Sequence, residues 1–219
     1  MPPEDAPNPA AEGTGFFGKL PSHSDFISRR LPASFREAWA AWLDASLERS
    51  REMLGEAWLE AYLSSPIWCF AASIGCVGGQ SLAGVLMPSL DRIGRYYPLS
   101  ILALTEGDEA AAEIAARTTQ WFARIEAIAL SCLADDFDFG AFDAALAAEP
   151  PPAGASASSI EAAAPRSNAE AIPRVLGRLL EQHGVAYSLW WTSGSMSVDA
   201  GCRAFLGLPP PEEFHALLR

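Results

Sequence analysis

Residues 67–105 read IWCFAASIGCVGGQSLAGVLMPSLDRIGRYYPLSILALT. This stretch holds three apolar runs, Ile67 to Ile74, Gly84 to Met87 and Pro98 to Thr105, with Gly-rich and Pro-rich turns between them. Short apolar runs bounded by such turns are typical of strands. The connections are too short for a crossover helix, so we expect the three strands to be antiparallel neighbours.

A Trp-rich helical pattern precedes these strands. Phe35 and Trp39 begin a row of large side chains at helical spacing, which predicts a helix from about 34 to 54. Ser34 and Glu37 have the spacing of a capping box at the start of this helix.

Further helices are expected before and after the strands in the sequence. Gly55 is suited to end the first helix, and a second short helix is expected over 56–63. After the strands, residues from Ile114 to Cys132 recur at alternating intervals of four and three, which predicts one long amphipathic helix that packs on the sheet. Phe139 and Phe142 indicate a shorter continuation.

The end of the chain predicts a hairpin and a final helical turn. Val185 to Thr192 and Met196 to Cys202 have strand composition and flank the turn pair Ser193-Gly194. The first of these strands carries Trp190 and Trp191 on opposite faces, so one can enter the core while the other covers it or meets a partner. A prolyl segment then leads to an amphipathic turn with Phe214 and Leu217.

The predicted class is mixed α/β, with a largely antiparallel central sheet of about five to six strands flanked by amphipathic helices. Residues 1–12 have no hydrophobic period and are expected to form a disordered tail. Residues 13–219 are expected to form a single domain, interrupted by a low-complexity Pro, Ala and Ser loop at 150–166. A helix containing Ile172 and Leu179 should follow, and the sequence leaves its first residue open.

Composition excludes several classes of function. The formal net charge of -12 and the pI near 4.6 oppose binding to nucleic acid. The longest apolar run, Ile67 to Val77, is too short to span a bilayer, and no signal peptide precedes it, so we expect a soluble, cytoplasmic protein without membrane insertion. The four cysteines are isolated and the three histidines lack ligand spacing, which predicts free thiols and no metal site.

Two near-matches to catalytic motifs lie close to the N-terminus. Gly13 and Gly18-Lys19 satisfy most of GxxxxGK, but Leu20 replaces the magnesium-binding Ser or Thr and Pro21 opposes the required helix. A Phe16-Phe17 edge strand that turns at Gly18 explains these residues better.

The residues that follow have the types found in hydrolase triads. Ser22, His23 and Asp25 are neighbours in sequence, whereas a triad converges from separated segments, so a polar turn is the better interpretation. No catalytic residue and no cofactor is therefore predicted, and Lys19 stands out as the only lysine of the chain.

The turn from Pro88 to Pro98 concentrates charged residues between two predicted strands. The guanidinium groups of Arg92 and Arg95 could bind a carboxylate or phosphate on a partner. Alternatively, Asp91 and Arg95 could form an internal pair that stabilises the turn. The sequence leaves both interpretations open.

Three blocks together resemble the TagF family of type VI secretion accessory proteins. They are GFFGKLPSH (residues 15–23), PSLDRIGRYYPL (88–99) and SLWWT (188–192), and they occur in family order. The resemblance extends over residues 15–218. Ser24 departs from it, because a glycine is expected before Asp25.

The resemblance implies a non-enzymatic protein that represses type VI secretion after translation by binding the forkhead-associated (Fha) scaffold protein. It also implies a functional link to the threonine kinase pathway and to a PppA-type phosphatase, whose domain we do not expect within this chain. The residues expected to contact protein partners are Asp91, Arg92, Arg95, Lys19, His23, Asp25 and Trp191. Two alternatives remain: a nucleotide-binding or hydrolytic enzyme that uses Lys19, His23 and Asp25, and a structural subunit of the secretion apparatus.

Overall fold

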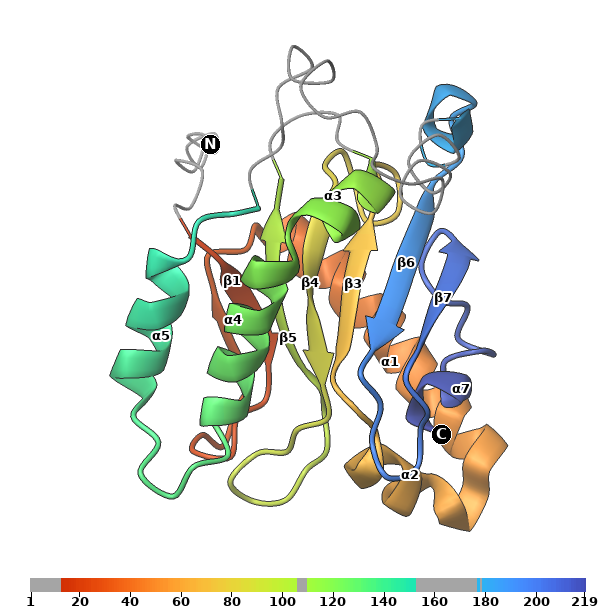
Figure 1. The fold of residues 1–219 in the computed structure, drawn as a ribbon. Helices are drawn as coiled ribbons and strands as arrows, with labels where there is room; N and C mark the ends of the chain where they lie inside the picture. Colours follow the sequence, from red (N-terminus) through yellow and green to blue (C-terminus); the bar gives the residue numbers. More distant parts are fainter. Residues whose placement is uncertain (1–12, 106–109, 153–176, 178) are drawn as a thin grey trace, which may run out of the picture.

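The computed structural model describes residues 13–105, 110–152, 177 and 179–219 (Figure 1). The expected tail at 1–12, most of the low-complexity loop at 150–166 and the start of the helix before Leu179 lie outside these residues. All three therefore stay predictions.

One antiparallel sheet organises the described chain. Its strand order is β2-β1-β5-β4-β3-β6-β7, and every neighbouring pair is antiparallel. The strands are β1 (Gly15–Gly18), β2 (Ile27–Arg29), β3 (Trp68–Ala72), β4 (Leu82–Met87), β5 (Leu99–Leu104), β6 (Tyr187–Thr192) and β7 (Gly201–Leu206). The three strands expected between 67 and 105 are confirmed as β3, β4 and β5, and the mixed α/β class is confirmed with them.

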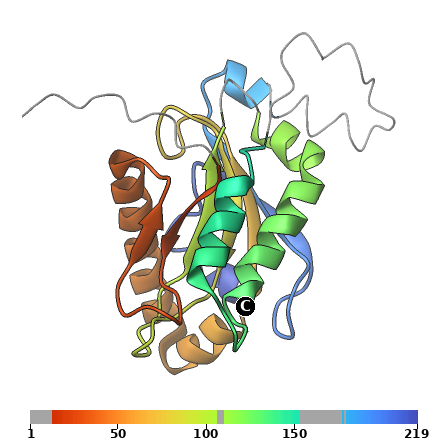
Figure 2. The same cartoon turned by 90° about the vertical axis from the view of Figure 1, so that its left-hand side faces the viewer.

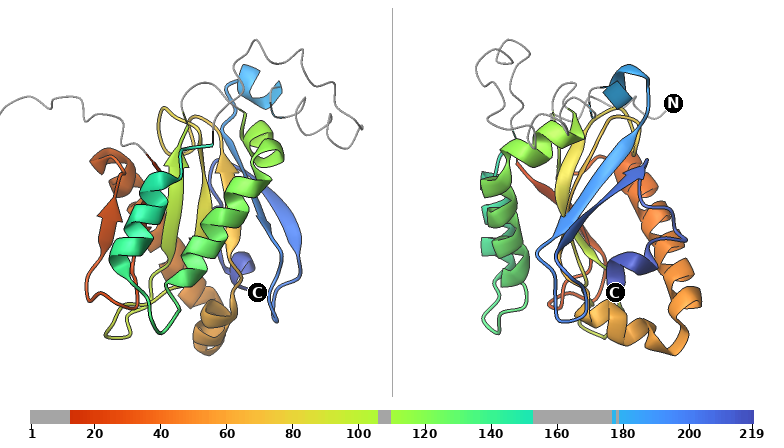
Figure 3. Two further views of the ribbon diagram at one scale, coloured as in Figure 1. Left: turned by 60° about the vertical axis from the view of Figure 1, so that its left-hand side comes forward. Right: turned by 45° about the vertical axis from the view of Figure 1, so that its right-hand side comes forward.

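Helices cover both faces of this sheet (Figures 2 and 3). On one face lie α3 (Ala111–Arg117), α4 (Thr119–Ser131) and α5 (Phe139–Ala148). On the other lie α1 (Ala33–Leu54), a 3-10 turn (Gly55–Ala57), α2 (Trp58–Ser64) and the short α7 (His215–Leu218). None of the helices in the described part of the chain combines the length and apolar character needed to cross a bilayer.

The central strands β3, β4 and β5 are almost entirely apolar because each of their faces supports a separate core, and the one polar side chain among them, Ser100, accepts a hydrogen bond from the indole N–H of Trp39. In β3, Cys69 points into the core under α3 and α4, whereas Phe70 points into the core under α1. The second core is strongly aromatic: the ring of Phe70 stacks on Trp39 at 5.3 Å and on Trp190 at 4.7 Å. A continuous apolar run in the sequence is the expected signature of a strand buried on both faces.

The strand count differs from the expectation of five to six because β2 has only three residues. Two of them, Ser28 and Arg29, are polar, so the segment shows no strand pattern. Since β2 forms the outer edge, the Phe16-Phe17 strand expected at the edge lies one position inside it, paired with β5 on its other side.

Two helix boundaries also differ from the sequence interpretation. The predicted long helix is two helices, α3 and α4, which break at Thr118, where φ is -112° and the side chain donates a hydrogen bond of 2.6 Å to the carbonyl of Ile114. Side-chain competition of this kind is common for threonine. The capping box is wrong as well, because α1 begins at Ala33 after Pro32 and has no side-chain cap. Gly55 ends this helix as expected.

The second strand of the final hairpin lies later than predicted, at Gly201–Leu206 instead of Met196 to Cys202. The apolar residues Met196 and Val198 belong to the connecting loop, in which the backbone N–H groups of Ser197 and Val198 both donate to the hydroxyl of Ser195 at 3.2 Å. These local bonds satisfy backbone groups that a strand would have paired. The final turn with Leu217 is confirmed as α7.

Candidate protein-binding site

Two loops meet at one end of the sheet, at the bottom of Figure 1. One is residues 19–26, between β1 and β2, and the other is residues 88–98, between β4 and β5. We call the pair the double loop. Figure 1 draws both loops beyond the ends of the strands that they connect.

Hydrogen bonds between the two loops hold them together. The Ser89 hydroxyl donates to the carbonyl of Lys19 at 2.7 Å. The backbone N–H of Arg92 donates to the carbonyl of His23 at 2.9 Å, and the guanidinium of Arg95 donates to the carbonyl of Ser24. Each bond has at least one main-chain partner, so together the three bonds hold the backbones of the two loops against each other.

The carboxylate of Asp91 lies at the centre of this arrangement and is fully buried. It accepts hydrogen bonds from the ammonium of Lys19 at 2.9 Å and from Nε of Arg95 at 2.6 Å. It also accepts the backbone N–H groups of Arg95 at 2.9 Å and of Ile93 at 3.1 Å. A buried charge requires such complete pairing.

This environment sets the charge state of Asp91. Burial by itself raises the pKa of its carboxyl group, but the hydrogen bonds from the backbone and side chain of Arg95, from Lys19 and from the backbone of Ile93 have the larger combined effect. The resulting pKa lies well below the usual range for aspartate, so Asp91 is a carboxylate at neutral pH.

The tip of the second loop is a small closed hairpin. Leu90 and Tyr96 form an isolated antiparallel bridge, and the N–H of Asp91 donates to the carbonyl of Arg95 at 3.0 Å. Gly94 turns the chain with φ of 86°, a left-handed conformation that favours glycine. The tip therefore has one defined shape.

Tyr62 of α2 supports the base of the same loop. Its hydroxyl donates to the carbonyl of Ser89 at 2.8 Å and accepts the N–H of Ser89 at 3.0 Å. Burial raises the pKa of Tyr62, so the phenol keeps its proton for the first of these bonds. The double loop is thus tied to the helical layer as well as to the strands.

The outer surface of the double loop is open to solvent. Ile93 is 65% exposed and Phe26 is 52% exposed, although both are large apolar side chains. Arg92 is exposed, and within the described residues its side chain has no ion-pair or hydrogen-bond partner. Exposed apolar and arginine side chains on a fixed backbone are characteristic of protein-binding surfaces.

A groove of about 410 Å³ continues this surface along the edge of the sheet. It combines aromatic rings with guanidinium groups. Its lining residues are Phe17, His23, Phe26, Ile27, Ser28, Arg29, Arg36 and Phe139.

Six of the seven residues that the sequence proposed for partner contacts meet in the double loop: Lys19, His23, Asp25, Asp91, Arg92 and Arg95. They have different environments. Lys19 and Asp91 are buried, Arg95 bonds Asp91 and Ser24 while remaining half exposed, and Arg92 faces solvent. The internal Asp91–Arg95 pair considered from the sequence is therefore present, and it leaves Arg92 exposed.

Trp191 lies elsewhere. Its ring packs edge-on against Phe122 of α4 at 4.7 Å, on the face of the sheet that α3, α4 and α5 cover. The neighbouring Trp190 fills the aromatic core on the opposite face, under α1. The sequence interpretation missed two residues of the double loop, Phe26 and Ile93, and the supporting Tyr62 of α2. The available signal was an apolar residue inside each polar turn.

The catalytic near-matches are not assembled in this geometry. Strand β1 lies inside the GxxxxGK near-match and ends at Gly18, a turn instead of a helix follows it, and the Lys19 ammonium bonds Asp91 instead of facing an open phosphate site. His23 lies 2.8 Å from the adjacent Ser22 hydroxyl and packs on Phe139, while Asp25 is directed to Arg95 and solvent. Within the described ranges, no three His, Cys, Asp or Glu residues are grouped to hold a metal ion.

Comparison with known proteins gives a family. The family model described as the TagF N-terminal domain, type VI secretion system-associated, matches residues 15–148. The crystal structure of PA0076 from Pseudomonas aeruginosa PAO1 is 36% identical, covers 94% of this chain and 93% of its own, and superimposes with a TM-score of 0.80. No curated protein matches this chain. With a double loop built from the first two blocks of the resemblance and a family match over more than half of its length, the chain belongs to the TagF family of type VI secretion-associated proteins.

Proposed function

We propose that this protein represses type VI secretion after translation by binding the Fha scaffold protein of the apparatus, without catalysis, in the cytoplasm. The observation that supports it best is the double loop, a closed and buried framework that presents Ile93, Phe26 and Arg92 to solvent. Family membership supplies the link to secretion. The link to the kinase pathway and to a PppA-type phosphatase belongs to the same proposal.

The charges around the double loop favour recognition of an acidic or phosphorylated partner segment. Arg92 and Arg95 lie in the double loop, and Arg29 and Arg36 line the adjoining groove, in a chain whose net charge is -12. The buried ammonium of Lys19 is matched by Asp91. A local excess of guanidinium groups on an acidic protein restricts where an anionic partner can bind.

A pulldown with the cognate scaffold tests the proposal. The double variant Arg92→Ala/Ile93→Ala removes exposed side chains, whereas Arg92 ties the loops through its backbone N–H alone. We expect wild-type protein to retain the scaffold and the variant to retain at least about tenfold less, because central aromatic, aliphatic and arginine contacts dominate interfaces.

The matched control is Arg117→Ala/Ile74→Ala. Arg117 is exposed at the end of α3, and Ile74 is 40% exposed in the β3–β4 loop, at the opposite end of β4 from loop 88–98. This control should bind like wild type. If wild-type protein retains no scaffold, the proposed partner is wrong; if the two double variants bind equally well, the proposed surface is wrong.

Secretion in cells tests the direction of the effect. Deleting the gene should raise secretion, wild-type protein should restore repression, and the Arg92→Ala/Ile93→Ala protein should fail to restore it at equal abundance. Performing the pulldown from cells with and without the pathway's kinase shows whether the interaction depends on phosphorylation. Lower secretion after deletion would instead favour a structural subunit.

A further inference from the structure

The two edges of the sheet differ in how they are protected. At one edge, β2 has three residues, one of them Arg29, and is followed by Arg30 with φ of 56°. A short, charged strand that ends in a distorted residue is a poor template for another strand. This edge has the features by which natural proteins prevent edge-to-edge association.

The other edge, β7, lacks these features. It has six residues, and in the described part of the chain β6 is its only neighbouring strand. Five of the six residues are exposed, and Leu206 is 75% exposed. The strand contains no lysine or proline, and Arg203 is the only charged residue in β6 and β7 together. An exposed edge strand of six residues with a single charged side chain favours pairing with another strand.

Each face of β7 carries a distinct row of side chains. The register pairs Leu206 with Tyr187, Ala204 with Leu189 and Cys202 with Trp191, and paired residues share a face. Cys202, Ala204 and Leu206 therefore continue the apolar row of β6. This row points to the side of the sheet that carries α4 and α5, which lie toward the β1 end, away from β7 (Figure 1). The opposite row of β7 holds Arg203 and Phe205.

We propose that β7 pairs with β7 of a second copy of this chain, in an antiparallel arrangement centred on Ala204. A twofold axis perpendicular to the sheet keeps each row on its own face, so only registers centred on one residue are possible. With Ala204 at the axis, Cys202 lies opposite Leu206 of the second copy. Arg203 then lies opposite Phe205 of the second copy on the other face.

The sequence of β7 favours this register over its neighbours. Centring on Arg203 would place two guanidinium groups directly opposite each other, which is destabilising. Centring on Phe205 would pair three residues of the strand instead of the five from Cys202 to Leu206. The Ala204 register is also self-complementary: apolar residues meet on one face, and the cation meets an aromatic ring on the other. Because β6 and β7 carry a single positive charge, the acidic net charge of the chain does not gather at this edge.

Measuring the mass of the intact protein by light scattering over a range of concentrations tests the association. We expect a dimer for wild-type protein. Leu206→Lys should raise the dimer dissociation constant by on the order of tenfold or more, because it places two ammonium groups in the apolar row. Leu130→Lys is the matched control, since Leu130 is 51% exposed on α4, away from the edge, and this variant should dimerise like wild type.

Oxidative cross-linking tests the register. In a Cys202→Ser background, Ala204→Cys places two thiols at the axis, where opposing Cα atoms lie about 4.5–5.5 Å apart, within disulfide range. Arg203→Cys is the control in the same strand, because its thiol faces Phe205 of the second copy. We expect a covalent dimer for Ala204→Cys at least about tenfold faster than for Arg203→Cys.

Three results would overturn the proposal. One is a monomeric wild-type protein at every concentration, with amide exchange of β7 then showing whether another segment of the same chain covers the edge. A second is a dimer equally stable in Leu206→Lys and wild type. A third is cross-linking of Arg203→Cys as fast as that of Ala204→Cys. The proposed scaffold site is the double loop, which connects β1 to β2 and β4 to β5 and does not include β7. The two associations therefore use different surfaces, and either proposal can fail alone.

Discussion

The ammonium group of Lys19 lies 2.9 Å from the carboxylate of Asp91, although 72 residues separate them in the chain. Their side chains are 7% and 0% exposed. The pair joins the end of β1 to the β4–β5 loop and thereby closes the interior of the double loop. Such a pair is specific in geometry, and removing one member leaves a buried charge unmatched.

Asp91→Asn should lower the melting temperature by at least several degrees. The amide keeps the shape of the side chain but leaves Lys19 without a counter-charge and weakens the bonds from Arg95. Calorimetry or circular dichroism measures the shift. Asp25→Asn is the control, because the Asp25 side chain is 96% exposed and its removal should change the melting temperature by about 1 °C or less. Equal shifts would show that the buried pair contributes little.

The contribution of Asp91 to stability should disappear in acid. Its pKa in the folded protein is depressed below the unfolded value of about 3.9, so the folded state binds the proton less readily than the unfolded state. The stabilisation is therefore fully present above about pH 4 and is lost as the pH falls through the folded pKa. Urea midpoints of wild type and Asp91→Asn should differ most near neutral pH and converge below about pH 4. A difference that grows in acid would contradict the depressed pKa.

Lys19 should resist amine-reactive labels in the native protein. It is the only lysine in the chain, and its side chain is 7% exposed. We expect acylation of Lys19 to be slower by on the order of a hundredfold or more in native protein than in urea, because reaction requires local opening of the double loop. Mass spectrometry of the peptide measures this, with the amino terminus as the reactive reference. Rapid native labelling would show that the loop opens readily.

Gly84→Ala should destabilise the protein by about 1–3 kcal/mol. A Cβ at Gly84 would lie 2.5 Å from the carbonyl oxygen of Ile101, 2.6 Å from Cβ of Leu102 and 2.8 Å from Cζ of Phe70, so the central strands would have to move apart. Gly79→Ala is the matched control, since a Cβ there meets no atom within 4 Å. This change should be neutral or slightly stabilising. Urea denaturation distinguishes the two variants.

The fold was predictable from the sequence where burial on both faces leaves a continuous apolar run, as in β3, β4 and β5. It was less predictable where local polar bonds decide the structure. Thr118 breaks a regular helical pattern through its own hydroxyl, and Ser195 holds an apolar segment in a loop. In β2, pairing with β1 overrides a composition that shows no strand pattern.

The candidate site was predictable in composition but not in environment. The turn with Asp91 and Arg95 could be identified from its charged residues, and their internal pairing was one of two open interpretations. The partnership of Asp91 with Lys19 was not foreseen, because no periodicity relates residues on separate loops. Sequence therefore grouped these residues as contacts, whereas the structure divides them into a buried framework, Lys19 and Asp91, and an exposed surface that includes Arg92.

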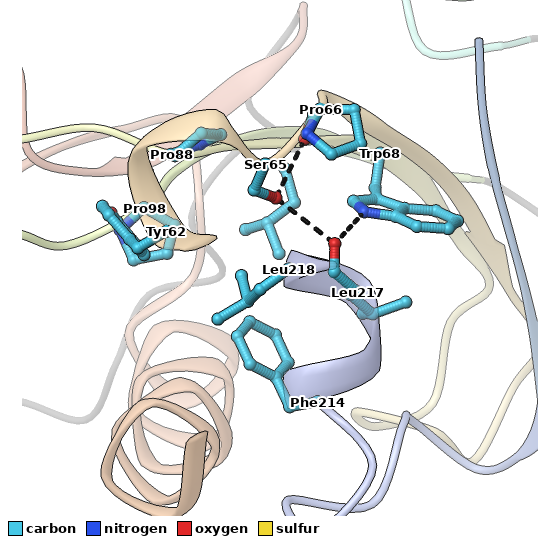
Figure 4. A pocket seen from close by; sticks show the side chains of 10 residues that line it. Tyr62, Ser65, Pro66, Trp68, Pro88, Pro98, Phe214, Leu217 and Leu218 are labelled. Carbon is cyan, nitrogen blue, oxygen red and sulfur yellow. Dashed lines mark hydrogen bonds between the residues drawn. The ribbon is translucent and has the colours of Figure 1, made fainter. Parts of the chain in front are cut away.

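The C-terminal segment closes the core that the matched family segment leaves open. Strand β6 pairs with β3, and Trp190 stacks on Phe70 at 4.7 Å. The indole N–H of Trp68 donates to the carbonyl of Leu217 at 2.8 Å, beside a cavity of only about 10 Å³ (Figure 4). Its lining includes Tyr62 of α2, Leu217 of α7 and, from the double loop, Pro88 and Pro98. This seam has room for about one water molecule and none for a ligand.

The family match spans residues 15–148, but we expect the folded unit to need the C-terminal segment as well, because β6 pairs with β3. A fragment cut at residue 148 would leave the backbone of β3 unpaired along one side and would uncover Phe70 and Trp68. Binding studies that use such a fragment would measure non-specific association of the exposed β3 edge and apolar core. The physical module extends to α7, and only a protein that includes this helix presents the double loop on its native support.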